Sequence, residues 1–328
     1  MLSVRSLVNK TTPHHPNPDI LQALNASFGE RLRRDVSLSR LTAARIGGPA
    51  DLLVEVLSLE ELEMISNLLW SASFDFVVLG DGSNVLVSDA GVRGLVIINR
   101  AKGVSFEERS NPPQVYAESG ANLGVVARQS AARGIAGLEW AAGIPGTVGG
   151  AVVGNAGAHG GDMSGNLLVA DILHQSRGRE AWSVEQLGYR YRSSVIKQGN
   201  SLGKSPQVVV LAARMHLEHG SPEAIQAKLD EFLLRRRRTQ PPGASMGSMF
   251  RNPEGDYAGR LIEAAGLKGY RIGNAQISSL HANFFINLDK ATAADVYSLI
   301  QLARQAVSEK FGVELELEIE LVGDWKTK

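Results

Sequence analysis

The sequence predicts an α+β protein made of three consecutive units. Segments of strand length, rich in branched apolar residues, lie among amphipathic segments of helix length, and glycine- and proline-rich turns separate them. A chain of 328 residues exceeds the ~150 residues of a typical domain, and its 44% hydrophobic content is sufficient for packed cores. We expect an N-terminal extension at 1–34 and units at 35–100, 101–219 and 220–328.

The N-terminal extension contains several prolines, and we expect a flexible start followed by one short helix. In the first unit, a strand at Leu52–Val56 leads into a helix. Ser58 is placed to cap this helix, with Glu61 three residues later completing a capping box. Three short strands separated by glycine turns follow, in FVVLG (76–80), NVLVSD (84–89) and GLVIIN (94–99).

The second unit contains one clear helix, Asn122–Arg133, which ends before Gly134. Strands are expected around 168–174 and 207–217. Between these strands, residues 199–206 have the composition of a surface loop.

The third unit begins at Ser221-Pro222-Glu223, which supplies an N-cap, a proline for the first turn and an acid at the positive end of a helix. That helix ends in Arg235–Arg238. A second helix is expected after Thr292, with a Thr-x-x-Asp cap at its start and Gly312 at its end. The chain then closes with an alternating strand, Val313–Val322.

Composition excludes several classes of protein. Lys and Arg total 34 and so do Asp and Glu, so the net charge is zero and a globally basic nucleic-acid binder is not expected. Arg235–Arg238 is interpreted as a cationic end that complements the helix dipole. The chain has no cysteine, which excludes disulfides, thiolate metal sites and thiol nucleophiles, and we expect no metal site.

Apolar runs are short. Leu95–Ile98 is typical of them and falls far short of the ~20 residues of a membrane helix, so we expect no membrane partner. The N-terminal segment lacks the apolar core of a secretion signal. These observations favour a cytoplasmic protein, and we expect a monomer.

Glycine is abundant, with 35 residues, and it is clustered. The clusters are RIGGPA (45–50), GDGSN (80–84), GIPGTVGGA (143–151) and GNAGAHGG (154–161). Such clusters indicate backbone packed closely against a ligand, and ordinary turns are the alternative. GDGSN could form an anion nest for a pyrophosphate or a hairpin turn. It is not a dinucleotide-binding fingerprint, because Val85 stands where glycine is required.

Taken in order and spacing, RIGGPA, GDGSN and GLEWAAGIPGTVGGAVVGNAGAHG (137–160) resemble the UDP-N-acetylenolpyruvoylglucosamine reductase family. The C-terminal half agrees through YRSSVIK (191–197), GSMFRNP (247–253), AGLKGYRIGNAQIS (265–278), HANFFIN (281–287) and FGVELELEIELVG (311–323). The resemblance implies a PCMH/vanillyl-alcohol-oxidase-type FAD-binding module of two α+β subdomains, at 35–100 and 101–219, followed by a C-terminal α+β substrate-binding domain. The third unit is short and matches the family type that lacks a tyrosine-bearing loop.

The resemblance implies FAD as the bound cofactor and NADPH as the hydride donor. No cysteine is present and GDGSN has no histidine neighbour, so we expect the FAD to be non-covalent. The implied cofactor contacts are Arg45, Gly47, Gly80, Asp81, Gly82, Ser83, Asn84, Gly143, Ile144, Pro145, Gly146, Thr147, Gly149, Gly150, Asn155 and Gly157.

Three catalytic positions are implied. Arg192 would be a cation near the flavin and the substrate carboxylate; if 188–192 is a strand, Arg190 shares its face and only the resemblance chooses between them. Ser248 would be the proton donor, which a serine can be only toward a very basic atom such as a carbanion. Its alternative is a turn serine.

Glu318 is the third implied position. It alternates with apolar residues beside Glu314, Glu316 and Glu320, and the alternative to a catalytic role is a solvated acidic strand face. The family motif often reads Leu-Glu-Pro-Glu, whereas residues 315–318 are Leu-Glu-Leu-Glu, and the missing proline loosens the register.

Substrate contacts are implied at Tyr191, Arg251, Asn252 and Gln276, with ordinary loop polarity as the alternative. The nucleotide phosphates would be bound either by arginines of the run Arg235–Arg238 or by Arg251, and the sequence does not choose between them. His159 is expected to pack.

The function that the resemblance implies is the NADPH-dependent reduction of UDP-N-acetylglucosamine enolpyruvate to UDP-N-acetylmuramate, a step of peptidoglycan precursor synthesis. Its partners would be these small molecules, with no nucleic acid. The alternative on the same fold is a PCMH-type flavin oxidase of a small alcohol.

Overall fold

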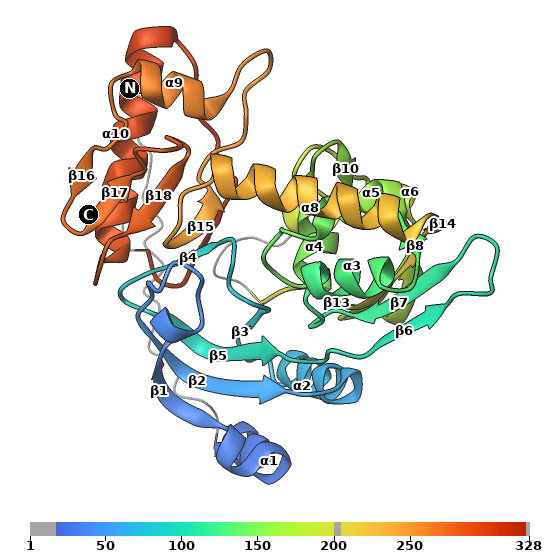
Figure 1. Cartoon of the computed structure of the whole chain (residues 1–328). Helices are drawn as coiled ribbons and strands as arrows, with labels where there is room; N and C mark the ends of the chain where they lie inside the picture. Colours follow the sequence, from blue (N-terminus) through green and yellow to red (C-terminus); the bar gives the residue numbers. More distant parts are fainter. Residues whose placement is uncertain (1–17, 200–204, 326–328) are drawn as a thin grey trace, which may run out of the picture.

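The computed structural model describes residues 18–199 and 205–325. Figure 1 shows three units along the chain: a blue and cyan unit, a green unit and an orange-red unit. The predicted flexible start, and residues 200–204 of the predicted loop, lie outside the described residues. Every helix in the described ranges is too short or too polar to cross a lipid bilayer.

The first unit is a four-stranded sheet in the order β1 (Arg33–Ser37), β2 (Pro49–Val56), β5 (Val92–Asn99), β3 (Phe76–Leu79). β1 runs antiparallel to β2, and β2, β5 and β3 are parallel. Helices α1 (Pro18–Phe28) and α2 (Leu59–Ser71) pack their apolar residues against one face. β4 (Val85–Val87) follows β3 after the GDGSN turn.

The predicted cap of α2 is half correct. The Ser58 side chain accepts from the backbone N–H of Glu61, as a capping box requires. The Glu61 carboxylate, however, accepts from Leu57 N at 2.8 Å and binds the Arg31 guanidinium. The reciprocal bond of a capping box, to Ser58 N, is therefore replaced by one to the preceding residue.

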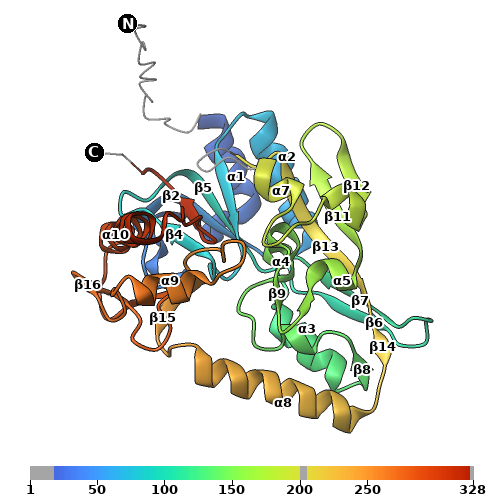
Figure 2. The ribbon, with the colours of Figure 1, turned by 90° about the horizontal axis from the view of Figure 1, so that it is seen from above.

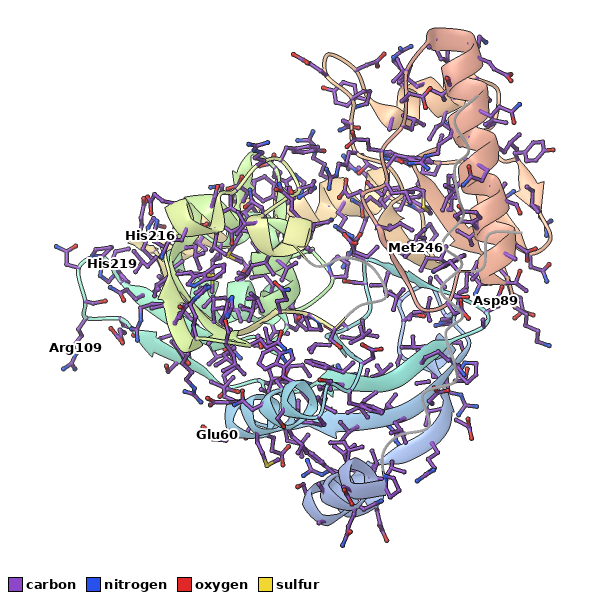
Figure 3. The ribbon with its side chains drawn as sticks, turned by 180° about the vertical axis from the view of Figure 1, so that it is seen from behind. Glu60, Asp89, Arg109, His216, His219 and Met246 are labelled. Carbon is purple, nitrogen blue, oxygen red and sulfur yellow. The ribbon has the colours of Figure 1, made fainter. Side chains whose placement is uncertain are left out.

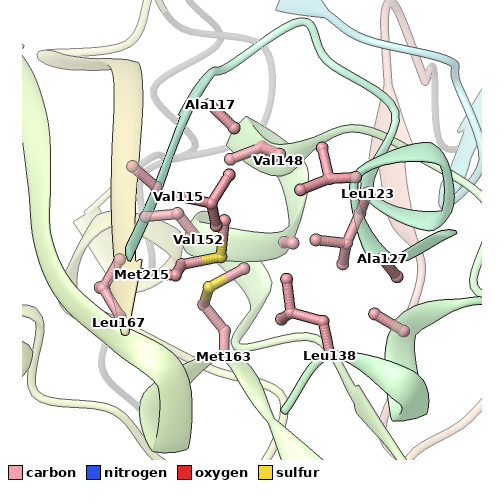
Figure 4. Close-up of a cluster of buried hydrophobic side chains, with 14 of the residues drawn as sticks. Val115, Ala117, Leu123, Ala127, Leu138, Val148, Val152, Met163, Leu167 and Met215 are labelled. Carbon is pink, nitrogen blue, oxygen red and sulfur yellow. The ribbon is translucent and has the colours of Figure 1, made fainter. Parts of the chain in front are cut away.

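The second unit is an antiparallel sheet in the order β12 (Gly178–Trp182), β11 (Leu167–His174), β13 (Val208–His216), β7 (Gln114–Glu118), β6 (Val104–Glu107). α3 (Leu123–Ala131) and α4 (Val148–Gly154) pack over it. Figure 4 shows their apolar side chains converging with those of the sheet, among them Val115, Leu123, Val148, Val152 and Met215, and with Met163. α4 lies inside the glycine-rich stretch, where the sequence predicted no particular helix.

The third unit is the sheet β15 (Ala244–Ser248), β18 (Phe284–Asn287), β17 (Ala275–Ile277), β16 (Arg271–Ile272), covered by α9 (Ala258–Ala264) and α10 (Ala293–Phe311). The predicted capping box before α10 is confirmed. α8 (Pro222–Thr239), capped by Ser221 as predicted, spans from the second unit to the third (Figure 2). Its buried residues pack into the core of the second unit. The domain boundaries stay a prediction.

The remaining elements are short. They are η1 (Gly29–Arg31), η2 (Leu38–Arg40), β8 (Ile135–Ala136), η3 (Glu139–Ala141), β9 (Gly157–Ala158), β10 (Gly161–Asp162), α5 (Met163–Asn166), α6 (Val184–Leu187), α7 (Val195–Gly199), β14 (Glu218–His219) and β19 (Glu320–Val322).

The predicted strand Val313–Val322 is wrong in extent. Strand geometry is limited to β19, which pairs in parallel with β4, and a single bridge joins Leu317 to Phe250. The segment changes partners as it passes from the third unit to the first, so no continuous ladder forms. Asp89 also joins these units: its carboxylate accepts from Ala293 N and Ala294 N at the start of α10 (Figure 3).

Candidate active site

Two adjoining cavities lie where the three units meet. The first, about 300 Å³, is bounded by β3, the GDGSN turn, α4 and β13. The second, about 220 Å³, is bounded by residues 144–147, the end of β15 and the segment before β19. They share lining residues, so they lie side by side. The shared residues are Ser83, Asn84, Thr147, Gly150, Gly154 and Lys197.

Several glycines of the GDGSN and GIPGTVGGA segments pack against other parts of the protein, and two of them pack against the opposite segment. A Cβ on Gly80 would lie 2.4 Å from the Thr147 hydroxyl, and one on Gly146 would lie 2.6 Å from the Ser83 hydroxyl. A Cβ on Gly82, whose φ is +59°, would lie 2.5 Å from the Leu41 carbonyl. The close backbone approach inferred from these glycines is therefore mainly an approach to other residues of the same chain.

Gly150 and Gly154 are different. They lie one helical turn apart on α4 and line both cavities. Among the described residues, nothing lies within 4 Å of the position a Cβ would take on Gly154, and on Gly150 the nearest atom is at 3.8 Å. These two residues leave a stripe of bare backbone beside the cavity, which side chains would fill. Gly154 is a site residue that the sequence analysis did not single out.

Asp81 is used within the protein. Its carboxylate pairs with Arg100 of the first unit at 3.0 Å and accepts from the Asn122 amide of the second unit, also at 3.0 Å. The GDGSN turn thus joins the two units that border the first cavity.

The other implied cofactor residues divide into two groups. Gly80 to Asn84, Ile144 to Thr147, Gly149, Gly150 and Gly157 line one cavity or both. Arg45, Gly47, Gly143 and Asn155 are absent from both linings. Asn155 instead supports the site: its side chain donates to the Arg190 carbonyl at 3.3 Å and accepts from Ser164 N at 3.0 Å.

Residues 190–193 form a turn, so the strand considered for 188–192 is wrong. Arg190 and Ser193 exchange backbone hydrogen bonds of 3.0 Å, and Arg192 has a left-handed φ of +57°. The turn separates the two arginines. Arg190 is exposed, while Arg192 lines the second cavity. Tyr191 is 56% exposed and its ring lies 5.6 Å from the Arg192 guanidinium carbon.

Arg192 and Glu318 form an ion pair across the cavity wall, with 3.0 Å between Nε and Oε1. The alignment is not that of a hydrogen bond, so Nε is buried without an acceptor among the described residues. Only 15% of the Glu318 side chain is exposed. The pair is therefore an ionic contact in a largely desolvated position, and Arg192 Nε has no hydrogen-bond acceptor among the described residues.

The four glutamates of the closing segment do not share one solvated face. Glu314 and Glu316 are exposed, whereas the Glu318 side chain is largely, though not fully, buried. Burial raises the pKa of Glu318, and the positive charges of Arg192, Lys197 and Arg251 oppose that rise. Glu318 is thus the one acid of the four that the surrounding cations hold in a buried position.

Ser248 ends β15 and lines the second cavity together with Arg192 and Glu318. The backbone after Ser248 is fixed by Asn283, which is 3% exposed. The Asn283 side chain accepts from Phe250 N at 2.9 Å and donates to Phe250 O at 2.8 Å. The backbone carbonyl of Asn283 accepts from Met249 N at 2.7 Å. Asn283 was missed in the sequence, although it lies in the HANFFIN segment.

One arginine of the run Arg235–Arg238 turns inward. Arg236 lines the second cavity, and burial lowers its pKa. No carboxylate lies within ion-pair distance of it in the part of the chain that the structure describes. The exposed Arg235, Arg237 and Arg238 flank it.

The structure does not bring the other implied substrate contacts into the cavities. Arg251 lies 3.6 Å from Glu316, the Asn252 side chain accepts from Ala258 N, and the Gln276 amide donates to Gly269 O. His159 stacks on Phe232 of α8, with ring centroids 4.2 Å apart, and packs as expected. Residues 18–199 and 205–325 contain no His, Asp and Glu cluster that could hold a metal.

Comparison with known proteins gives first the class of protein. An FAD binding domain model matches residues 50–176, and the model of the UDP-N-acetylenolpyruvoylglucosamine reductase C-terminal domain matches residues 239–322. The fold is therefore that of an FAD-binding module followed by a reductase C-terminal domain, and the predicted α+β fold is confirmed.

The particular family follows from full-length relatives. UDP-N-acetylenolpyruvoylglucosamine reductase of Chloroflexus aggregans is 42% identical over 89% of this chain and 97% of its own length. That of Rubrobacter xylanophilus is 46% identical over 88% and 95%. The crystal structure of the Thermus caldophilus reductase matches with a TM-score of 0.74 and 35% identity, over 89% of this chain and 99% of that one. The chain belongs to the UDP-N-acetylenolpyruvoylglucosamine reductase family.

Proposed function

We propose that this chain reduces UDP-N-acetylglucosamine enolpyruvate to UDP-N-acetylmuramate with NADPH, as an FAD-dependent oxidoreductase of peptidoglycan precursor synthesis. One observation supports the site assignment above others. Arg192, Ser248 and Glu318 come from three separate segments and line one cavity that adjoins the glycine-lined one.

The residues present fit FAD. The bare backbone of Gly150 and Gly154 leaves room along α4 for a flat ring, and a cradle of this kind would be closed by any Cβ. The GDGSN turn, Thr147 and Gly149 would hold the remainder of the cofactor along the first cavity. Bound FAD supplies the redox chemistry, the transfer of a hydride from NADPH to C3 of the enolpyruvyl group.

Arg192 carries the electrostatic role. Negative charge develops at C2 of the enolpyruvyl group and spreads into its carboxylate. Arg192 lines the cavity that would hold this charge, its buried Nε has no hydrogen-bond acceptor among the described residues, and its guanidinium pairs with Glu318. By analogy with oxyanion holes, a preorganised donor of this type contributes about 3 kcal/mol to transition-state stabilisation.

Ser248 donates the proton to C2. A serine hydroxyl is a weak acid, but an enolate carbon is basic enough to take its proton when the two are held within hydrogen-bond reach. The Asn283 bonds to residues 249 and 250 keep the end of β15 in one position and so fix where the hydroxyl can lie.

Of the alternatives for the phosphate clamp, Arg236 is the candidate that we select. It is a cation without a carboxylate partner among the described residues, and it lies in the wall of the substrate cavity. A buried guanidinium gains charge-assisted hydrogen bonds when a diphosphate takes the place of water.

The test of the function is turnover. Purified yellow protein should oxidise NADPH rapidly only when the enolpyruvyl nucleotide is present, and the product should be UDP-N-acetylmuramate by mass spectrometry. The alternative, a flavin oxidase of a small alcohol, is not favoured, because residues 239–322 match the reductase C-terminal domain. Alcohol-dependent oxygen consumption without any response to the nucleotide would support it instead.

We further propose that the protein acts as a cytoplasmic monomer without nucleic-acid, membrane or metal partners. We propose units bounded at 35–100, 101–219 and 220–328, with α1 and the start of β1 packing onto the first unit from the N-terminal extension. Its balanced charge of 34 basic and 34 acidic residues supports the absence of a nucleic-acid role. Light scattering coupled to gel filtration, with and without added DNA, tests the oligomeric state and the nucleic-acid prediction together.

A further inference from the structure

Lys197 lies where the two cavities join. It belongs to α7, and it lines both cavities although only 12% of its side chain is exposed. Its backbone is fixed: Lys197 N donates to the Ser194 hydroxyl, and that hydroxyl donates to the Val153 carbonyl of α4 at 2.6 Å. A buried lysine held in this way is a fixed charge rather than a mobile surface cation.

The Lys197 ammonium contacts the segment that carries Glu318 at two points. It donates to the Glu318 backbone carbonyl at 3.1 Å and pairs with Glu320 Oε1 at 2.9 Å. The Glu318 carbonyl also accepts from the Asn84 side chain at 3.1 Å. One carbonyl therefore receives donors from the first and second units, and Lys197 supplies the donor from the second.

We propose that Lys197 is a positioning residue for Glu318: it fixes the backbone of that residue and supplies a positive charge that keeps its carboxylate ionised, while Glu320 limits how much of that charge Glu318 experiences. The proposal rests on the role of Glu318 proposed above. Lys197 touches Glu318 only through its backbone and acts on the reaction through it.

The charges that face Glu318 come from several elements. Arg192 approaches from the turn at 190–193, Lys197 from α7 and Arg251 from the end of β15, and all three lower the pKa of Glu318 against the effect of burial. Glu320, in β19, is the acid paired with Lys197. Removing Lys197 and removing Glu320 should therefore shift the pKa of Glu318 in opposite directions.

Lys197→Met removes a positive charge, so the pKa of Glu318 rises and the acid limb of the kcat/KM profile moves to higher pH. Glu320→Gln keeps a hydrogen-bond acceptor for the ammonium but removes a negative charge, so the same limb moves to lower pH. Lys197→Met should also slow flavin reoxidation by the enolpyruvyl nucleotide about 10-fold to 100-fold, the cost of a displaced catalytic group. Lys197→Arg, which retains the charge, should leave the limb where it is.

The experiment measures kcat/KM against pH for the wild type and for these three variants. In parallel, calorimetry gives the affinity for UDP-N-acetylmuramate as a function of pH, which does not depend on turnover. The matched control is Lys268→Met, which breaks an equivalent ion pair, 2.8 Å to Glu263, outside both cavities and should change neither profile.

Opposite displacements in Lys197→Met and Glu320→Gln would support the proposal. The proposal would be overturned if the acid limbs of both variants stayed in place or moved in the same direction. This holds for variants that retain FAD and bind product. A wild type that does not reduce the enolpyruvyl nucleotide would overturn the proposed function, and with it this inference. Normal wild-type turnover with unmoved limbs would overturn this inference alone.

Discussion

The side-chain amide of Asn84 donates a 3.1 Å hydrogen bond to the backbone carbonyl of Glu318, 234 residues further along the chain. The Asn84 carbonyl accepts from Glu320 N in return. The GDGSN turn, which borders the cofactor cavity, is thus joined directly to the segment that carries the buried acid. Contacts that fix the GDGSN turn therefore also fix the position of Glu318 relative to the cofactor cavity.

The first prediction concerns the bare backbone of α4. Gly154→Leu should reduce FAD affinity at least about 10-fold, roughly 1.4 kcal/mol, because its side chain would occupy the open space beside the helix. The fold should survive, since nothing within 4 Å of the added Cβ in the described structure has to move. Flavin absorbance per protein, with circular dichroism for folding, measures both.

The control is Gly165→Leu, which places the same side chain on a helical glycine that lines neither cavity. A Gly154→Leu protein that purifies with a full complement of FAD would contradict the prediction. Gly82→Val is a poorer test, because its Cβ would meet the Leu41 carbonyl at 2.5 Å and the protein could lose FAD by losing its fold.

The second prediction is that the FAD is bound non-covalently, so that denaturing the protein releases all of it. The chain has no cysteine, and no histidine adjoins the GDGSN turn, so a covalent link has no partner in these segments. Acid precipitation should leave all flavin absorbance in the supernatant. A coloured pellet that resists repeated washing would count against it.

Local signals in the sequence predicted much of this fold, because their physics is local. Ser221 caps α8 and Thr292 caps α10 through bonds to residues three positions away, and Gly312 ends α10 with a left-handed φ of +67°. The segment Val313–Val322 shows the limit. Alternation predicts which residues turn inward, but not that the pairing partner changes from Phe250 to β4.

The catalytic residues needed more than pattern. The left-handed turn at Arg192 is held from outside by Asn155, which binds the Arg190 carbonyl, and no local signal in the sequence announces that contact. α4 was missed because glycine is a poor helix former; Thr147 caps it, and core packing by Val148 and Val152 overrides the low propensity. Tertiary contacts decided both cases.

The third prediction separates two neighbouring arginines. Arg192→Met should slow flavin reoxidation by the enolpyruvyl nucleotide by about 10²-fold or more, in the range seen for loss of one preorganised donor. Loss of this cation also removes the largest charge that opposes the effect of burial on Glu318, so the pKa of Glu318 rises. The acid limb of the pH profile should therefore move to higher pH, and activity at low pH should be lost first.

Arg190→Met is the matched control, since Arg190 belongs to the same turn but is exposed and lines neither cavity. Stopped-flow traces over a pH series measure both variants. If Arg190→Met were the slower of the two, the assignment of the catalytic cation to Arg192 would be wrong.

The fourth prediction concerns the phosphate clamp. Arg236→Met should raise KM for the enolpyruvyl nucleotide about 10-fold to 100-fold, as expected for loss of hydrogen bonds to a charged group worth ~1.5–3 kcal/mol. kcat should change little, because the phosphates are bound equally in ground and transition states. Arg237→Met, an exposed neighbour on α8, should leave KM within about twofold in the same steady-state assay. Equal KM values for the two variants would exclude Arg236 as the clamp.

The last prediction concerns Ser248 and separates the two halves of the reaction. Ser248→Ala should leave flavin reduction by NADPH nearly unchanged, because no proton is delivered to carbon in that half. Reoxidation by the enolpyruvyl nucleotide should slow by ~10²–10⁴-fold, the usual contribution of a positioned acid. Ser248→Cys should recover part of this rate, since a thiol can also donate a proton.

The backbone around Ser248 should be insensitive to both changes, because Asn283 holds residues 249 and 250 by three hydrogen bonds that do not involve the Ser248 side chain. Single-turnover stopped-flow measurement at 450 nm, about the flavin absorption maximum, follows each half-reaction separately. A Ser248→Ala enzyme in which both halves slow by the same factor would mean that this residue shapes the flavin site. Slowing confined to the second half identifies Ser248 as the group that protonates C2.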